Sequence, residues 1–114
     1  MSPEGIWTSE IMGVFGWESM GIMVIERGRA IDGGNHHFSV GTYESTDGEI
    51  RISLSVEYHS TPRTIFGAAD RKLSVEINGK LKGDRIEGTA HRLDKPNQKV
   101  TIKLSRRADI PPPA

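Results

Sequence analysis

The chain contains no cysteine among its 114 residues. That absence excludes disulfide bonds, zinc sites built on thiolates and thiol nucleophiles. No apolar run approaches the 18 residues that a membrane helix needs, and the opening Met1-Ser2-Pro3-Glu4 has no basic segment followed by an apolar one. We therefore expect a cytoplasmic protein without a membrane partner.

The chain also lacks an excess of charge of either sign, since Lys plus Arg and Asp plus Glu both total 15. A neutral protein has no general field that attracts a polyanion, so a nucleic-acid partner is not expected. Aromatic residues are scarce, at 6%, whereas glycine is frequent, with 13 residues. Many glycines and few large side chains are typical of short strands joined by tight turns. We expect one domain over residues 1–108, followed by a disordered, proline-rich tail at 109–114.

The strongest pattern in the sequence is a strict alternation of apolar and polar residues. It extends from Ile50 to Tyr58 and recurs at 73–77 and 100–104. A period of two indicates a strand with one buried face. The turn residues Asp47-Gly48 and Lys82-Gly83-Asp84 between such segments are typical of hairpins.

The fold class predicted from this rhythm is all-β, an eight-stranded antiparallel up-and-down barrel. Only the connection from His59 to Arg71 is long. Its Thr61-Pro62 pair is compatible with the start of a short helical turn, and an irregular surface loop is the equal alternative. The eight strands are expected at about 5–14, 18–27, 29–32, 38–45, 49–58, 72–81, 85–91 and 99–105.

The interior of the predicted barrel is lined by medium and small side chains. An eight-stranded barrel either fills its interior or holds one small ligand, depending on side-chain volume. The predicted composition favours a cavity for a small apolar ligand. The residues expected to face inward, of which the first nine are the candidate ligand-binding residues, are Ile22, Val24, Phe38, Val40, Ile52, Leu54, Val56, Val75, Ile77, Gly88, Ala90 and Ile102.

The second strand is apolar on both faces. Met20, Ile22 and Val24 occupy one face, which we assign to the interior, while Met23 and Ile25 occupy the other. An outward apolar pair needs a cover. One alternative is that the N-terminal segment or the 59–71 loop lies over it; the other, which we prefer, is a symmetric homodimer with Met23 and Ile25 at the interface.

Chemical motifs are few. The four histidines have no zinc-type spacing, and His36 and His37 are neighbours that a strand would point to opposite faces. No nucleophile elbow, H-E-x-x-H motif or phosphate-binding glycine loop occurs, and Gly33-Gly34-Asn35 is better explained as a tight turn. We therefore predict no metal, no cofactor and no catalytic residue, hence no enzyme.

Several glycine-centred motifs resemble the GrlR-like family, which is named for a negative regulator of a bacterial type III secretion system. They are Gly5-Ile6-Trp7, the segment 28–34 (Gly-Arg-Ala-Ile-Asp-Gly-Gly), Gly41 and the connection at Pro62. The resemblance covers about residues 5–105. It implies a lipocalin-like (calycin-type) barrel, dimerisation, and action through contact with a transcriptional activator.

That family's regulator carries an acidic E-D-E-D run at the tip of a hairpin, which is linked to its regulatory contact. The corresponding turn here, Thr46-Asp47-Gly48-Glu49, keeps two acidic residues and has the glycine of an ordinary hairpin. By resemblance, Asp47 and Glu49 are the candidate partner-binding residues.

The opening Gly5-Ile6-Trp7 also resembles the G-x-W motif of lipocalins, in which the tryptophan closes the barrel floor beneath an arginine of the last strand. Continuing the alternation of Val100, Ile102 and Leu104 makes Arg106 inward-facing. We expect Arg106 to lie against Trp7; ordinary core packing of Trp7 is the alternative.

Overall fold

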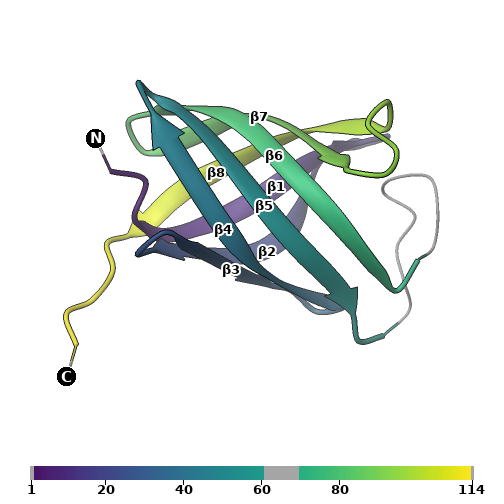
Figure 1. Ribbon diagram of the computed structural model, residues 1–114, viewed down its shortest axis with the longest axis horizontal. Coiled ribbons are helices and arrows are strands. Elements are labelled where there is room, and N and C mark those ends of the chain that lie inside the picture. Colours follow the sequence, from purple (N-terminus) through teal and green to yellow (C-terminus); the bar gives the residue numbers. More distant parts are fainter. Residues whose placement is uncertain (1, 61–69, 114) are drawn as a thin grey trace.

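The computed structural model describes residues 2–60 and 70–113. These residues form a closed antiparallel barrel in which each strand pairs with the next and the last pairs with the first (Figure 1). The predicted all-β, eight-stranded, up-and-down barrel is confirmed, and it is consistent with a lipocalin-like architecture. The strands are β1 (Gly5–Gly13), β2 (Gly16–Glu26), β3 (Arg29–Gly33), β4 (His37–Thr46), β5 (Glu49–Tyr58), β6 (Lys72–Lys82), β7 (Arg85–Arg92) and β8 (Lys99–Ala108).

Outside the strands, the chain is made of short turns and a terminal segment. Residues 109–113 form no strand and extend away from the barrel (Figure 1). The helical turn considered after Thr61 falls within residues 61–69, which lie outside the described part. The described residues include no helix of the length and hydrophobicity that crossing a membrane requires.

The hairpin turns follow the local sequence. Between β4 and β5, Asp47 and Gly48 have φ angles of 53° and 80°. Positive φ at both central residues is the geometry of a tight hairpin turn, and Asp followed by Gly tolerates it well. This turn therefore sets the register in which Thr46 lies opposite Glu49.

The core is a single cluster inside the barrel. Strand β5 supplies it as the alternation predicts, with Ile52, Leu54 and Val56 buried and Ser53 and Ser55 on the outer face. The inward assignment is confirmed for the residues of β5 to β8: Val75, Ile77, Ala90 and Ile102 are also buried, and Gly88 lies opposite Ile102 on the same face.

The inward assignment is wrong for β2. Met23 and Ile25, predicted at a dimer interface, are buried in the core, whereas Ile22 is 53% exposed and Val24 only half-buried. The register explains this, because Met23 lies opposite Trp7, a buried core residue, and directly paired residues share a face. An irregularity in the register between Ser9 and Glu10 also lets Met20 reach the core.

The inward assignment is also wrong for β4. Phe38 and Val40 are 44% and 47% exposed, and buried Ser39 faces the core instead. Strand β5 decides this orientation, since Ser39 pairs with buried Val56. The sequence suggests the opposite because Phe and Val are the apolar residues of this segment. We now place Ile22, Val24, Phe38 and Val40 on the outside of the barrel.

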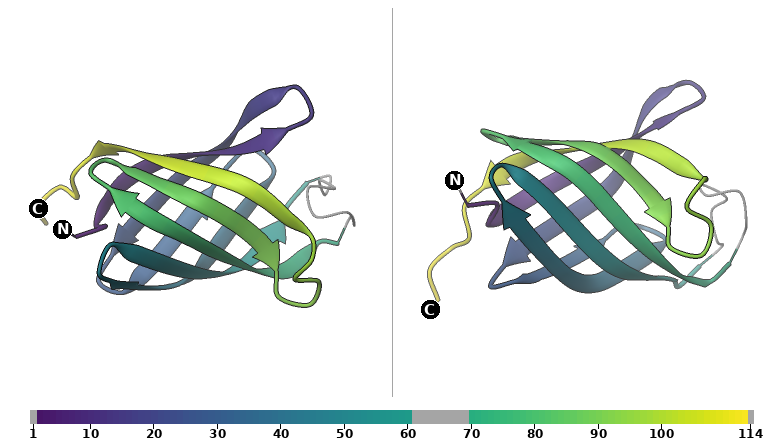
Figure 2. Two further views of the ribbon diagram at one scale, coloured as in Figure 1. Left: turned by 90° about the horizontal axis from the view of Figure 1, so that it is seen from above. Right: turned by 45° about the horizontal axis from the view of Figure 1, so that its top comes forward.

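The β1–β2 hairpin extends beyond the barrel (Figure 2). Its turn holds Val14 and Phe15, which are 93% and 99% exposed. Strand β2 begins at Gly16, two residues earlier than predicted, because the hairpin pairing continues to Gly13 opposite Gly16.

Candidate functional site

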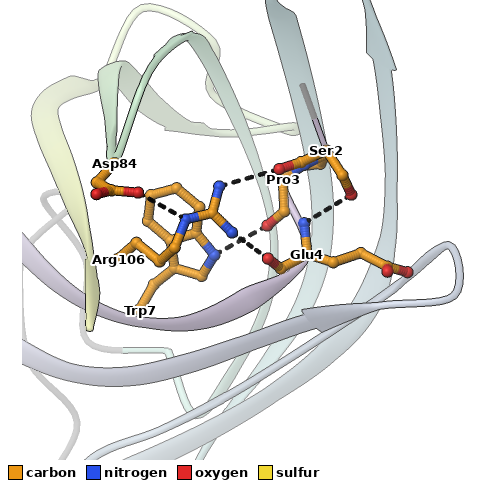
Figure 3. Close-up of polar contacts among 6 residues, drawn as sticks. All are labelled: Ser2, Pro3, Glu4, Trp7, Asp84 and Arg106. Atoms are coloured by element: carbon orange, nitrogen blue, oxygen red, sulfur yellow. Dashed lines mark hydrogen bonds and ion pairs between the residues drawn. The ribbon is translucent and has the colours of Figure 1, made fainter. Parts of the chain in front are cut away.

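One end of the barrel is built around Trp7 and Arg106 (Figure 3). The indole of Trp7 is fully buried, and its Nε1 donates a hydrogen bond of 2.9 Å to the carbonyl oxygen of Pro3. The guanidinium of Arg106 lies 4.6 Å from the ring centroid, within the range of a cation–π contact. The expected contact is confirmed.

Arg106 also ties the N-terminal segment to the β6–β7 turn. Its Nη1 donates to the carbonyl oxygen of Glu4, its Nη2 to that of Ser2 at 2.9 Å, and its Nε to Asp84 Oδ1 at 3.0 Å (Figure 3). These three acceptors are all groups of the chain itself. The arrangement therefore holds the barrel end together.

The barrel interior contains a small cavity of about 60 Å³. Four of the nine candidate ligand-binding residues line it, namely Leu54, Val56, Val75 and Ile77. Ala90 and Ile102, also predicted to face inward, line it too, whereas Ile52 lies in the core outside its lining. Pockets for drug-sized ligands are about 300–1,000 Å³. The cavity in this conformation is therefore far smaller than a lipid or a drug-sized molecule.

A buried polar group beside this cavity was not predicted from the sequence. Asp32 Oδ1 is 2.8 Å from His37 Nε2, and its Oδ2 accepts a hydrogen bond of 2.6 Å from Ser39. His37 and Ser39 are 7% and 0% exposed. The carboxylate lies between the other two side chains, whereas in a nucleophilic triad the imidazole lies between the serine and the carboxylate. The cluster satisfies buried polar atoms on the inner face of β3 and β4.

The other histidines take separate positions. His36 Nδ1 is 2.7 Å from Ser60 Oγ, while His59 is exposed directly after the last residue of β5. Across residues 2–60 and 70–113, no three His, Asp or Glu side chains gather in a way that could hold a metal ion.

Asp47 and Glu49, the candidates suggested by resemblance, are exposed at the tip of the β4–β5 hairpin. They line an open groove of about 680 Å³ that continues over β6 and β7. Its charges are mixed, and Arg51 pairs with Glu44 at 2.5 Å along it. The two acidic residues are thus accessible to a partner, but they are not part of a concentrated acidic surface.

The most distinctive surface is an apolar area on the outside of β2, β3 and β4. Val24, Ile31 and Val40 lie directly opposite one another across the three strands, and Ile22 and Phe38 lie in the next row on either side of Gly33. Ile22, Ile31, Phe38 and Val40 are 44–53% exposed. We call these five side chains (Ile22, Val24, Ile31, Phe38 and Val40) the outer apolar face.

Four of these five residues were predicted from the sequence to face the interior of the barrel, and Ile31 was not among the candidates. A continuous apolar surface of this kind on a small protein commonly marks a contact site. The sequence does contain a signal for this surface. Because β2 is apolar on both faces, one row of its apolar side chains must point outward whichever face is buried.

A comparison of the chain with protein-family models and with curated proteins finds no match. The likeness to the GrlR-like family thus rests on the motifs given above.

Proposed function

We propose that this chain is a non-catalytic regulatory protein that acts through protein–protein contacts in the cytoplasm, in the manner of the GrlR-type negative regulators it resembles. The outer apolar face is its contact surface, and a second copy of the chain is its first partner. A transcriptional regulator is the further partner that the resemblance implies, with Asp47 and Glu49 as contacts. The outer apolar face carries this proposal.

The reasoning is energetic. Burying apolar surface stabilises a complex by about 25 cal/mol for each Å² removed from water, and four large side chains are held about half exposed on rigid, paired strands. Side chains on strands lose little freedom when a partner covers them, so more of the burial energy goes into binding. Symmetric homodimers are the commonest oligomers and use one self-complementary surface.

The alternative function, a carrier or sensor for a small apolar ligand, has weaker support. The interior cavity is about 60 Å³, and Trp7 and the buried aliphatic side chains fill the rest of the barrel. A carrier would have to expand its core, which costs packing energy.

The proposal is tested by adding charge to the face. We expect wild-type protein to be a dimer in light scattering, and the double variant Ile31→Glu with Val40→Glu to be a monomer with an intact barrel by circular dichroism. Both side chains point outward, so the variant places its charges in water in the monomer and buries them only in the dimer.

The matched control is Ser74→Glu with Thr101→Glu, which adds the same charge at exposed positions of β6 and β8. It should remain dimeric. A dimeric face variant would show that this face is not the contact surface, and a stoichiometric small molecule in native mass spectra would favour the carrier.

A further inference from the structure

The protruding tip of the β1–β2 hairpin is the second exposed apolar surface of the molecule. It consists of Met12, Val14, Phe15 and Trp17, which are 44%, 93%, 99% and 39% exposed. Met12 lies opposite Trp17, and the turn carries Val14 and Phe15 beyond them. Turn residues are normally polar or glycine, so an aromatic ring held fully in water at a turn calls for a functional reason. We call these four residues the hairpin tip.

The hairpin tip and the outer apolar face together account for nearly all exposed hydrophobic bulk in the described residues. Among the described residues, nine large hydrophobic side chains are exposed. Eight of them belong to these two surfaces, and Leu93 is the exception. Taking about 200 Å² for a fully exposed large side chain, these eight present roughly 900 Å² per protomer. A standard interface buries about 800 Å² per partner, so the two surfaces together suffice for a stable dimer.

The outer apolar face has a gap that fits a single ring. Gly33 lies between Ile22 and Phe38 in one row across β2, β3 and β4. A Cβ added at Gly33 would meet no atom within 4 Å, so the space above its backbone is open. The gap is thus bounded by Ile22, Phe38 and neighbouring Ile31. One aromatic side chain placed there would contact apolar atoms on three sides.

The spacing of the two surfaces suits a two-fold axis. Both include residues of β2: Trp17 belongs to the hairpin tip and Ile22 to the outer apolar face. With a rise of about 3.3 Å per residue, Phe15 and Ile22 are about 20–25 Å apart along the strand direction. An axis crossing β2 near Ser19, midway between them, would put the tip of each protomer over the face of the other. A two-fold interface requires this reciprocity, in which residue i contacts residue j and j contacts i.

We propose that the second copy covers the outer apolar face with its hairpin tip, Phe15 of each protomer occupying the gap above Gly33 of the other. This inference rests on the proposed function, because it specifies which part of the second copy meets the face. The dimer then contains two identical tip-to-face contacts. A dimer in which the two faces simply meet would leave both hairpin tips in water.

The absence of native cysteine makes a direct test straightforward, because only introduced thiols can form a disulfide. Phe15→Cys protein is mixed with Phe38→Cys protein and oxidised mildly. The mixed dimer contains one protomer of each variant. At one tip-to-face contact the two introduced thiols meet, and at the other contact Phe15 and Phe38 are both unchanged. A disulfide needs Cβ atoms about 3.5–4.5 Å apart, so we expect a cross-linked dimer from this mixture and none from Phe15→Cys mixed with Thr101→Cys.

A second measurement gives the energetic weight of the tip. Phe15→Ser removes a fully exposed ring, so the barrel should keep its stability while dimerisation weakens by about 30-fold or more, as for an interface hot spot. Leu93→Ser is the matched control, since Leu93 is 51% exposed and lies outside both surfaces. Its dimerisation constant should be unchanged.

The outcomes separate this inference from the function on which it rests. A dimer that cross-links through Ile31→Cys alone, with no tip-to-face product, would overturn the inference and leave the dimeric regulator standing. A monomeric wild type would overturn both. Co-sedimentation of wild type, but not of Phe15→Ser, with phosphatidylcholine–phosphatidylglycerol vesicles would show that the tip binds lipid, and would overturn the inference.

Discussion

Arg106 covers the indole ring of Trp7, with its guanidinium carbon 4.6 Å from the ring centroid, and joins β8 to the N-terminal segment and to Asp84. The lysine in Arg106→Lys would keep the charge, but its single nitrogen lacks the planar group that lies on the indole and cannot replace three separate nitrogens that reach three partners. We expect Arg106→Lys to lower the free energy of unfolding by about 1–3 kcal/mol, the range of a charged hydrogen bond. Urea denaturation followed by Trp fluorescence measures it.

The neighbouring Arg107→Lys is the control, because Arg107 is exposed and its Nε donates one hydrogen bond to Thr8 Oγ1. It should change stability by no more than about 0.5 kcal/mol. Equal losses in the two variants would mean that the Trp7 contact contributes nothing specific.

Two adjacent positions of β5 test which face of the barrel is buried. Leu54 is 5% exposed, and Leu54→Asp would bury an unpaired carboxylate at a cost of several kcal/mol. We expect this variant to be unfolded by circular dichroism at 25 °C. Ser53→Asp, on the outer face, should fold normally, and similar melting temperatures for both would contradict the assignment.

Two glycines of neighbouring strands predict opposite responses to one methyl group. A Cβ at Gly41 would lie 1.7 Å from the backbone oxygen of Ser53, whereas a Cβ at Gly33 would meet no atom within 4 Å. Gly41→Ala must displace β4 from β5, and overpacking of this kind costs about 1–3 kcal/mol or more. We expect a clearly lower melting temperature for Gly41→Ala and little change for Gly33→Ala; the reverse order would show that the β4–β5 pairing differs from the one described.

Arg92 and Asp94 predict an acid-sensitive contribution to stability. Buried Arg92 donates two hydrogen bonds of 2.8 Å to the carboxylate of Asp94, and these lower the pKa of Asp94 from its ordinary value. A carboxyl with a lower pKa in the folded state stabilises the fold above its unfolded pKa, about 3.9, and loses this contribution as pH falls through the folded value. Asp94→Asn should therefore be less stable than wild type at pH 7.

The difference between wild type and Asp94→Asn should shrink progressively below about pH 4, because the wild-type carboxyl is then protonated as well. Thermal unfolding of both proteins between pH 2 and 7 measures this difference. Asp109→Asn, an exposed residue beyond β8, is the control. A difference independent of pH would mean that the ion pair contributes no stability.

Much of this architecture could be predicted from local patterns in the sequence. The alternation from Ile50 to Tyr58 determined which face of β5 is buried, because its two faces differ in polarity at every position. The Asp47-Gly48 turn determined the β4–β5 hairpin, since few residues adopt positive φ there without strain. The contact between Trp7 and Arg106 followed from continuing the alternation of β8 to its end.

Only the tertiary structure decided the orientation of β2 and β4. In β2 both faces are apolar, so the pattern alone does not distinguish Met23 from Val24; pairing with Trp7 does. In β4 the inward Ser39 is polar; pairing with Val56 of β5 turns it toward the core, and Asp32, seven positions earlier, accepts its hydrogen bond there. The outer apolar face exists because the pairing of β2 with β1 and of β4 with β5 turns both Val24 and Val40 outward. Burial depends on contacts between segments distant in sequence, and a local period carries no information about them.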